Sequence, residues 1–360
     1  MNLKERVPLA PRTTLGVGGE ARFFVEAKSV EEVRAALEFA RTQSLPLFVL
    51  GGGSNIVIAD EGFNGLVLAV RIPGMSVEHR DKTVVLTVGA GVPWDEFVAW
   101  TVDRGFVGLE CLSGIPGTVG GAVVANVGAY GAQASDSFMS AEALDQTDEQ
   151  NTVRVFKKEE CDFSYHDSSF SHADGRFIVL GASFVLSTGG TSRLSYRDSR
   201  FDLESLAKTL GHEPTLAEVR TAILQMRGMK GVLGSSYKSA GSFFHMPFVS
   251  VEKYEEIAAI ARARDAKKEE KLRPWVWKQA NGSYKIAPGF LLEYTEFQRG
   301  FVRGAIGISP KHTLSIINIS GGRAADIAQL ANDMRDAVEK TFGIRLEREV
   351  EYVGEVERGT

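Results

Sequence analysis

The sequence predicts an α+β protein with a glycine-rich N-terminal half and a separate C-terminal α/β domain. The first observation is a buried stretch, Leu45–Leu50, that runs directly into Gly51-Gly52-Gly53. The second is a pair of later glycine-rich turns, at residues 89–91 and 113–121. The third is a change in composition over residues 187–213, where polar sequence separates the two halves.

Local patterns predict the elements of the N-terminal half. Residues 29–43 form an amphipathic helix, which Ser29 caps and in which Glu32 completes a capping box. Apolar runs predict strands at 45–50, 65–70 and 83–88, and a later strand at 177–186. A helix begins at Pro93, because proline suits the first helical position.

The C-terminal half has its own signals. A second capping box, Thr215 to Glu218, precedes a helix with apolar positions at helical spacing. Apolar residues recur every three or four positions over 324–342, which predicts the longest clear helix. Alternation over 344–353 predicts a terminal strand. We therefore divide the chain into residues 1–188, split into two subdomains near 70, a connecting loop at 189–213, and a C-terminal domain at 214–360.

Composition excludes several classes of protein. The chain has 360 residues, 44% hydrophobic, with a net charge of −5 and a pI near 5.8, so it lacks the basic character of a nucleic-acid-binding protein. It has no apolar run of membrane-spanning length and no signal-peptide core at its start. Two cysteines and six scattered histidines show no metal-binding spacing. We expect a cytoplasmic protein with no metal, membrane or nucleic-acid partner.

The glycine loops favour one kind of phosphate site over two others. A P-loop needs a Gly-Lys-Ser/Thr ending, which does not occur. A Rossmann fingerprint opens a helix, whereas residues 51–55 run into Ile56-Val57-Ile58. The remaining possibility is a nest of backbone N–H groups for the pyrophosphate of a long dinucleotide such as FAD. By pattern alone, a purely structural glycine turn explains the loops equally well.

The segment Ser239-Ala240-Gly241-Ser242-Phe243-Phe244 is a candidate for catalysis. Glycine lets the backbone approach a ligand closely, and the two aromatics can exclude water. A hydroxyl in such a place can donate a proton to a reactive carbon. This pattern more often belongs to a buried serine whose hydroxyl only forms a hydrogen bond with the backbone.

Linked motifs make the chain resemble a known family, the UDP-N-acetylenolpyruvoylglucosamine reductases, also called UDP-N-acetylmuramate dehydrogenases. The resemblance extends from Thr14 to Glu355. In order, the motifs are residues 14–19, 50–55, 109–121, 126–131, 239–244 and 346–350. Six motifs in the same order make a chance resemblance implausible.

The resemblance implies an FAD-binding fold of the vanillyl-alcohol-oxidase type followed by a substrate-binding domain. It implies that NADPH reduces FAD, and that hydride then passes to the enolpyruvyl group of UDP-N-acetylglucosamine enolpyruvate to give UDP-N-acetylmuramate, a precursor of peptidoglycan. The residues it places against FAD are Leu50, Gly51, Gly52, Gly53, Ser54, Asn55, Ser113, Gly114, Ile115, Pro116, Gly117, Thr118, Gly120, Gly121, Asn126, Gly128, Tyr130 and Val179.

The resemblance also assigns catalytic and substrate-binding residues. Ser242 is the implied proton donor, and Glu349, or Glu347 beside it, is the implied partner near the developing enolate. The implied substrate contacts are Tyr165, Tyr196, Lys230, Met246 and Tyr294. A carboxyl near the developing charge must be at least partly protonated, or paired with a cation, to help.

Three positions depart from the family pattern. Where the family has an arginine that holds the substrate carboxylate, this chain has His166, which we expect to serve when protonated. Met246 replaces an amide, and Tyr294 stands where glutamine is common. Two alternatives to the reductase therefore remain open: a paralogous FAD enzyme acting on another nucleotide or enolpyruvyl-like acid, and a non-catalytic flavin-binding protein. We expect a monomer.

Overall fold

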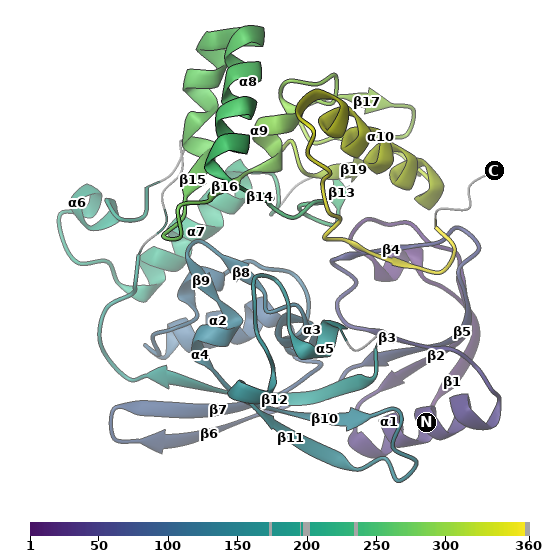
Figure 1. The fold of residues 1–360 in the computed structure, drawn as a ribbon. Coiled ribbons are helices and arrows are strands. Elements are labelled where there is room, and N and C mark those ends of the chain that lie inside the picture. Colours follow the sequence, from purple (N-terminus) through teal and green to yellow (C-terminus); the bar gives the residue numbers. More distant parts are fainter. Residues whose placement is uncertain (173–174, 195, 197–201, 234–236, 357–360) are drawn as a thin grey trace.

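The N-terminal residues form a four-stranded sheet with a helix packed on it (Figure 1). The computed structural model describes residues 1–172, 175–194, 196, 202–233 and 237–356. The helix, α1 (Val30–Thr42), turns its buried face toward the strands, and the Ser29 hydroxyl accepts the N–H of Glu32. The sheet order is β1 (Leu3–Pro8), β2 (Glu20–Ala27), β5 (Phe63–Val70) and β3 (Leu47–Leu50), antiparallel in its first pair and parallel in the other two.

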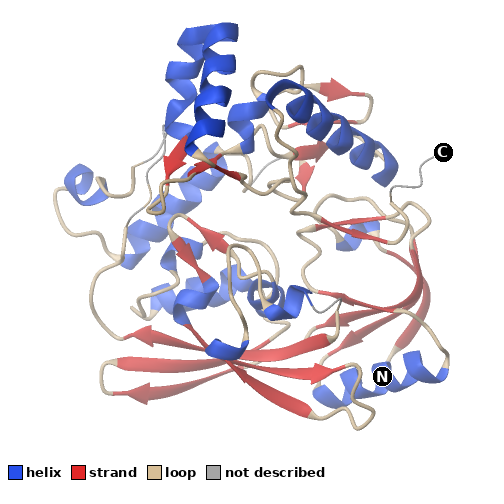
Figure 2. Cartoon of the chain, in the orientation of Figure 1, coloured by secondary structure: helices blue, strands red, loops and turns tan. Residues whose placement is uncertain are grey.

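A second, five-stranded antiparallel sheet follows, and short helices lie over one of its faces (Figure 2). The buried rings of Trp94, Phe97 and Phe184 pack together between the helices and this sheet. The sheet order is β11 (Val153–Lys157), β10 (Phe138–Asp145), β12 (Phe177–Ser187), β7 (Thr83–Gly89) and β6 (Met75–Arg80). The other elements here are α2 (Trp94–Asp103), α3 (Val119–Val124), α4 (Ala134–Ser137), α5 (Ser169–His172), and the hairpin β8 (Gly128–Ala129) and β9 (Ala132–Gln133).

The C-terminal part is built from two small sheets and three helices. The first sheet has the order β13 (Lys238–Ser239), β19 (Ile316–Asn318), β18 (Ile306–Ile308), β17 (Val302–Arg303), and the second β14 (Phe248–Val249), β16 (Tyr284–Ile286), β15 (Val276–Lys278). The helices are α8 (Val251–Leu272), α9 (Pro288–Leu292) and α10 (Ala324–Phe342). Two further helices, α6 (Leu206–Leu210) and α7 (Leu216–Met229), precede this part.

The N-terminal half has hydrophobic cores of its own, and part of it is also buried in the core of the C-terminal half. Leu15, Val17, Val57 and Ala59 are buried in the same cluster as the inner faces of α9 and α10. The strand β4 (Ile56–Ile58) pairs in parallel with β20 (Glu351–Val353), so the end of the chain returns to the N-terminal region. This pairing brings the segment that ends at Val350 beside the glycine loop that precedes β4.

The sequence-based expectations hold for most elements with strong local signals. The helices at 29–43, 215–229 and 324–342 and the strands at 65–70 and 83–88 are confirmed, including the Thr215–Glu218 capping box. The expected strand over 344–353 is wrong for its first part, because only Glu351–Val353 forms a strand, and residues 344–350 contribute a single isolated bridge, from Arg348 to Phe244. The short helix α6 lies within the expected connecting loop. Within the described residues, no helix is long and apolar enough to cross a membrane.

Candidate active site

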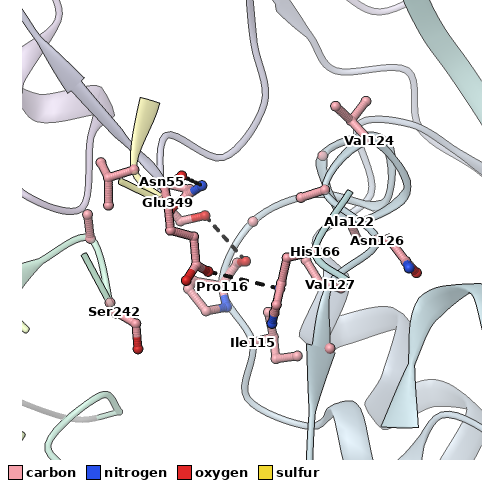
Figure 3. Close-up of a pocket in the computed structure, with 18 of the residues that line it drawn as sticks. Asn55, Ile115, Pro116, Ala122, Val124, Asn126, Val127, His166, Ser242 and Glu349 are labelled. Carbon is pink, nitrogen blue, oxygen red and sulfur yellow. Dashed lines mark hydrogen bonds and ion pairs between the residues drawn. The ribbon is translucent and has the colours of Figure 1, made fainter. Parts of the chain in front are cut away.

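A pocket of about 1750 Å³ opens between the two N-terminal sheets and the C-terminal part. Two glycine loops line it, the first at residues 51–55 and the second at residues 113–118. The turn at 164–167 and the segments 239–246 and 348–352 line it as well. Figure 3 shows part of this wall, with Glu349 drawn between Ser242 and His166. The pocket therefore collects residues that are far apart in the sequence.

The first glycine loop, residues 51–55, is shaped to bind a ligand that accepts hydrogen bonds from backbone N–H groups. A Cβ at Gly52 would collide with Gly117 of the second loop, and one at Gly53 would collide with the carbonyl of Arg12. The Arg71 guanidinium donates to the carbonyls of Leu50 and Gly51, at 3.4 and 3.0 Å. Among the described residues, none accepts a hydrogen bond from the N–H groups of residues 52–54. These N–H groups are therefore available to an anion in the pocket.

The second glycine loop, residues 113–118, is fixed from outside the pocket. Asp95 of α2 accepts the N–H of Gly114 at 2.5 Å and forms a two-pronged ion pair with Arg220 of α7, at 2.6 and 2.9 Å. Arg227, also on α7, donates to the Gly114 carbonyl at 3.0 Å. The helix α7 thus holds this loop against the first one.

Ser242 and Glu349 lie on two backbone segments that pair antiparallel. The Glu349 N–H donates to the Phe243 carbonyl at 3.0 Å, and the His245 N–H donates to the Glu347 carbonyl at 2.9 Å. The first glycine loop joins them, because the Asn55 side-chain amide donates to the Glu349 carbonyl at 3.1 Å. Both side chains line the pocket, whereas Glu347 does not.

Burial changes the acid–base properties of Glu349. Its side chain is 19% exposed, and desolvation raises its pKa to about 7, although the Lys285 ammonium opposes this. The Nδ1 atoms of His166 and His245 lie 3.9 Å from its two carboxyl oxygens. Glu349 is therefore a carboxyl that is partly protonated at neutral pH.

His166 is not the cation that the sequence led us to expect. It sits at the tip of the turn Ser164–Asp167 with φ of 54°, and the Asn126 amide holds that turn through the Ser164 carbonyl at 2.7 Å. Burial, together with the nearby His245 and Lys285, lowers the pKa of His166 to about 4. The expectation of a protonated His166 is therefore corrected: near neutral pH its imidazole carries no charge. Arg197, a later arginine in the sequence, lies outside the described residues.

The positive charge beside Glu349 comes from Lys285 on β16. Its ammonium lies 3.6 Å from the centroid of the Tyr165 ring, at the pocket wall. The sequence alone does not point to this residue, because no local pattern marks a lysine in a three-residue strand. His245 and Arg227 were missed as well, and both line the pocket.

A second cation, Lys230, lies at the end of α7. Its ammonium donates to the Tyr196 hydroxyl at 3.0 Å and lies 5.0 Å from the ring centroids of both Tyr130 and Tyr196. The two tyrosine rings meet edge to face at 5.1 Å. Lys230, Tyr196 and Tyr130 thus form one cationic and aromatic corner of the pocket.

Most, but not all, of the site residues expected from the sequence line this pocket. Met246 and Tyr165 do so, as does every expected FAD contact except Ser113, which is buried and bonds to the Glu110 carbonyl. The expected substrate contact of Tyr294 is wrong, because this residue does not line the pocket. Its side chain is buried in the C-terminal core, between Phe290 and Phe342. Tyr294 comes two residues after the end of α9, whose residues are all buried, and its ring packs against Phe290 of that helix.

Comparisons with known proteins agree with this arrangement. A family model described as "FAD binding domain" matches residues 21–154, and one described as "UDP-N-acetylenolpyruvoylglucosamine reductase, C-terminal domain" matches residues 234–353. The UDP-N-acetylenolpyruvoylglucosamine reductase of Thermobifida fusca is 38% identical over 97% of both chains. This chain belongs to the UDP-N-acetylenolpyruvoylglucosamine reductase family. The enzyme of that name from Pseudomonas aeruginosa is 34% identical over 97% of this chain and 98% of its own.

The fold of the family is also present. The crystal structure of UDP-N-acetylenolpyruvylglucosamine reductase from Thermus caldophilus is 24% identical, covers 98% of this chain and 99% of its own, and superposes with a TM-score of 0.65. The expected fold class, an FAD-binding region of the vanillyl-alcohol-oxidase type followed by the C-terminal domain of this family, is confirmed. The exact limits of the domains stay a prediction.

Proposed function

We propose that this protein uses FAD and NADPH to reduce the enolpyruvyl group of UDP-N-acetylglucosamine enolpyruvate, giving UDP-N-acetylmuramate. Membership of the reductase family supports this reaction. The observation that carries the proposal is the placement of Ser242 and a partly protonated Glu349 on paired segments, next to the two glycine loops of one pocket.

The pocket suits FAD. The unbonded N–H groups of residues 52–54, together with the loop at 113–118, would hold the pyrophosphate. The two loops approach so closely that a Cβ at Gly52 would collide with Gly117. When bound, FAD accepts electrons from NADPH and supplies them to the substrate as hydride. The buried Val179 and Leu50 would add apolar contact, and Asn126 fixes the neighbouring turn.

The substrate brings negative charge, which the pocket meets with two lysines. The ammonium of Lys230 suits the diphosphate of a nucleotide sugar, with Tyr196 beside it. Lys285, over the Tyr165 ring, suits the enolpyruvyl carboxylate, because an anion in a dry site needs a cation. The neutral His166 and Met246 complete this wall as uncharged groups.

The chain's own acid–base groups then handle the proton. Hydride must add to the methylene carbon, because only then does the new negative charge form on the carbon next to the carboxylate, as an aci-carboxylate. The Ser242 hydroxyl, which bonds to no group among the described residues, gives its proton to that carbon. Glu349 in its protonated form adds no repulsion and restores the proton lost by Ser242.

The experiment separates the two half-reactions. The purified protein should release FAD, identified by mass, on acid treatment. NADPH should bleach the bound flavin, and UDP-N-acetylglucosamine enolpyruvate should reoxidise it anaerobically with formation of one UDP-N-acetylmuramate per flavin. Bleaching without reoxidation by this compound would exclude the proposed substrate.

One alternative has an observation in its favour. The uncharged His166 and Met246 stand where the family has an arginine and an amide, so a paralogue with another enolpyruvyl-like acid would explain both changes. A panel of such acids in the reoxidation experiment separates the two. We further propose that the protein acts as a monomer in the cytoplasm, without nucleic acid, which sedimentation and fractionation would test.

A further inference from the structure

The carboxyl of Glu349 lies between two imidazoles, one to each oxygen. The Nδ1 of His166 is 3.9 Å from Oε1, and the Nδ1 of His245 is 3.9 Å from Oε2. His166 reaches it from the turn at 164–167, and His245 from the segment that carries Ser242. Figure 3 shows the contact between His166 and Glu349 as a dashed line. All three side chains line the pocket and are at most 30% exposed.

We propose that His245 is a positioning residue which, together with His166, holds the Glu349 carboxyl in one orientation and shares a single proton with it. The inference rests on the proposed function, in which Glu349 handles the proton of the reaction. At 3.9 Å neither imidazole is yet hydrogen-bonded, and such contacts commonly tighten when substrate binds. His245 acts on the reaction only through Glu349.

The surroundings allow one proton in this cluster, not two. Two protonated imidazoles would repel each other across Glu349, and a charged His166 would also be repelled by the Lys285 ammonium. Tyr165 lies against the His166 ring on one side, with ring centroids 4.4 Å apart. Burial lowers the pKa of His245, although the carboxylates of Glu347 and Asp167 oppose this shift. The guanidinium of the neighbouring Arg348 lies over the Tyr352 ring. The cluster can thus exchange one proton while its net charge stays small.

Neutral imidazoles suit both forms of the carboxyl. An imidazole can present either N–H or a bare nitrogen at Nδ1, depending on its tautomer. The bare nitrogen accepts from protonated Glu349, and the N–H donates to its ionised form. The carboxyl can therefore lose and regain a proton without leaving its place. The arrangement is not a metal site: among the described residues, no group of three or more His, Cys, Asp and Glu side chains could hold a metal ion.

The first test reads the imidazoles directly in the oxidised, FAD-loaded enzyme. Nitrogen-15 NMR of labelled histidine follows each ring between pH 5 and 9. We expect the rings of His166 and His245 to change together at the pH where Glu349 ionises, near 7. In Glu349→Gln this shared step should vanish, while exposed His212 is unchanged. Independent titrations of the two rings, unaffected by Glu349→Gln, would overturn the proposal.

The second test is kinetic. His245→Phe removes the nitrogen that stabilises ionised Glu349, so the alkaline fall in the rate of flavin reoxidation should move to higher pH by about one unit, equivalent to a tenfold change in proton affinity. His245→Gln, which keeps a donor, should shift it less, and His212→Gln should not shift it. A uniform loss of rate with an unchanged inflection in both His245 variants would mean a structural role only.

The two tests keep this inference separate from the proposed function. If the enolpyruvyl substrate does not reoxidise the flavin of the native enzyme, the proposed function fails. The shared step in the NMR titration still decides whether His166, Glu349 and His245 hold one proton, since it needs no turnover.

Discussion

At the scale of single residues, environment decides which acid does chemistry. Glu347 and Glu349 have the same side chain and are two positions apart, yet Glu347 is exposed and lies outside the pocket. Glu349 faces the pocket, where desolvation raises its pKa to about 7. The sequence left either residue as the candidate. What separates them is their place in the folded chain, since only Glu349 of the two lines the pocket.

Removing the proton donor should therefore slow one half-reaction only. We expect Ser242→Ala to leave bleaching of the flavin by NADPH nearly unchanged and to slow its reoxidation by roughly 10²–10⁴-fold, the usual cost of a lost acid or base. Glu349→Gln should act on the same step, and Glu347→Gln should not. Stopped-flow absorbance of the flavin measures both steps. Equal slowing of both steps in Ser242→Ala would make this serine a structural residue.

The pH dependence of reoxidation follows from Glu349 rather than from His166. Because Glu349 acts protonated and has a pKa of about 7, the rate should fall as the pH rises through 7. His166, with a pKa of about 4, is neutral throughout pH 5–9 and adds no inflection there. His166→Arg places a fixed cation near the carboxyl, stabilises its ionised form, and should move the fall to lower pH. Rate against pH for the two proteins checks this, and a fall displaced to higher pH would contradict it.

At the scale of elements, the site is assembled by loops that strands and one helix hold in place. The glycine loops could be predicted from sequence, since close backbone approach selects glycine locally. The antiparallel pairing of the Ser242 and Glu349 segments could not, because its partners are about one hundred residues apart and form a single isolated bridge. Lys285 and His245 were missed for the same reason: their importance comes from neighbours distant in sequence.

A side chain added at the contact between the two glycine loops should weaken the binding of FAD. Gly52→Ala puts a methyl group against the backbone of Gly117, so we expect the loops to separate and the protein to lose most of its bound FAD. Gly189→Ala is the matched control, because nothing lies within 4 Å of a Cβ there. The flavin-to-protein ratio after gel filtration, with circular dichroism to confirm folding, measures the effect. Full retention of FAD by Gly52→Ala would show that the loops do not bind the cofactor as a pair.

At the scale of the whole molecule, the two halves of the chain are connected by hydrogen bonds and buried apolar contacts as well as by the linking segment. The Asn318 amide donates to the Leu15 carbonyl at 3.1 Å, deep in the shared C-terminal cluster. Such contacts are invisible in the sequence, which shows only a composition change between the halves. A site built from both halves needs this connection, because Glu349 and the first glycine loop must keep their register.

Asp60 provides the test of that connection. Its carboxylate accepts the N–H groups of Ala324 and Ala325, at 2.9 and 3.1 Å, and so caps α10 from the N-terminal half. Losing a helix cap costs about 0.5–2 kcal/mol. We expect Asp60→Ala to lower the Tm by a few degrees, Asp60→Asn to lower it less because the amide oxygen still accepts, and the exposed Asp81→Ala to leave it unchanged. Circular dichroism and flavin fluorescence, followed together, should show one transition that shifts as a whole. If helix content were lost at a lower temperature while flavin release stayed in place, the halves would unfold independently, and the pocket between them would depend on the N-terminal half alone.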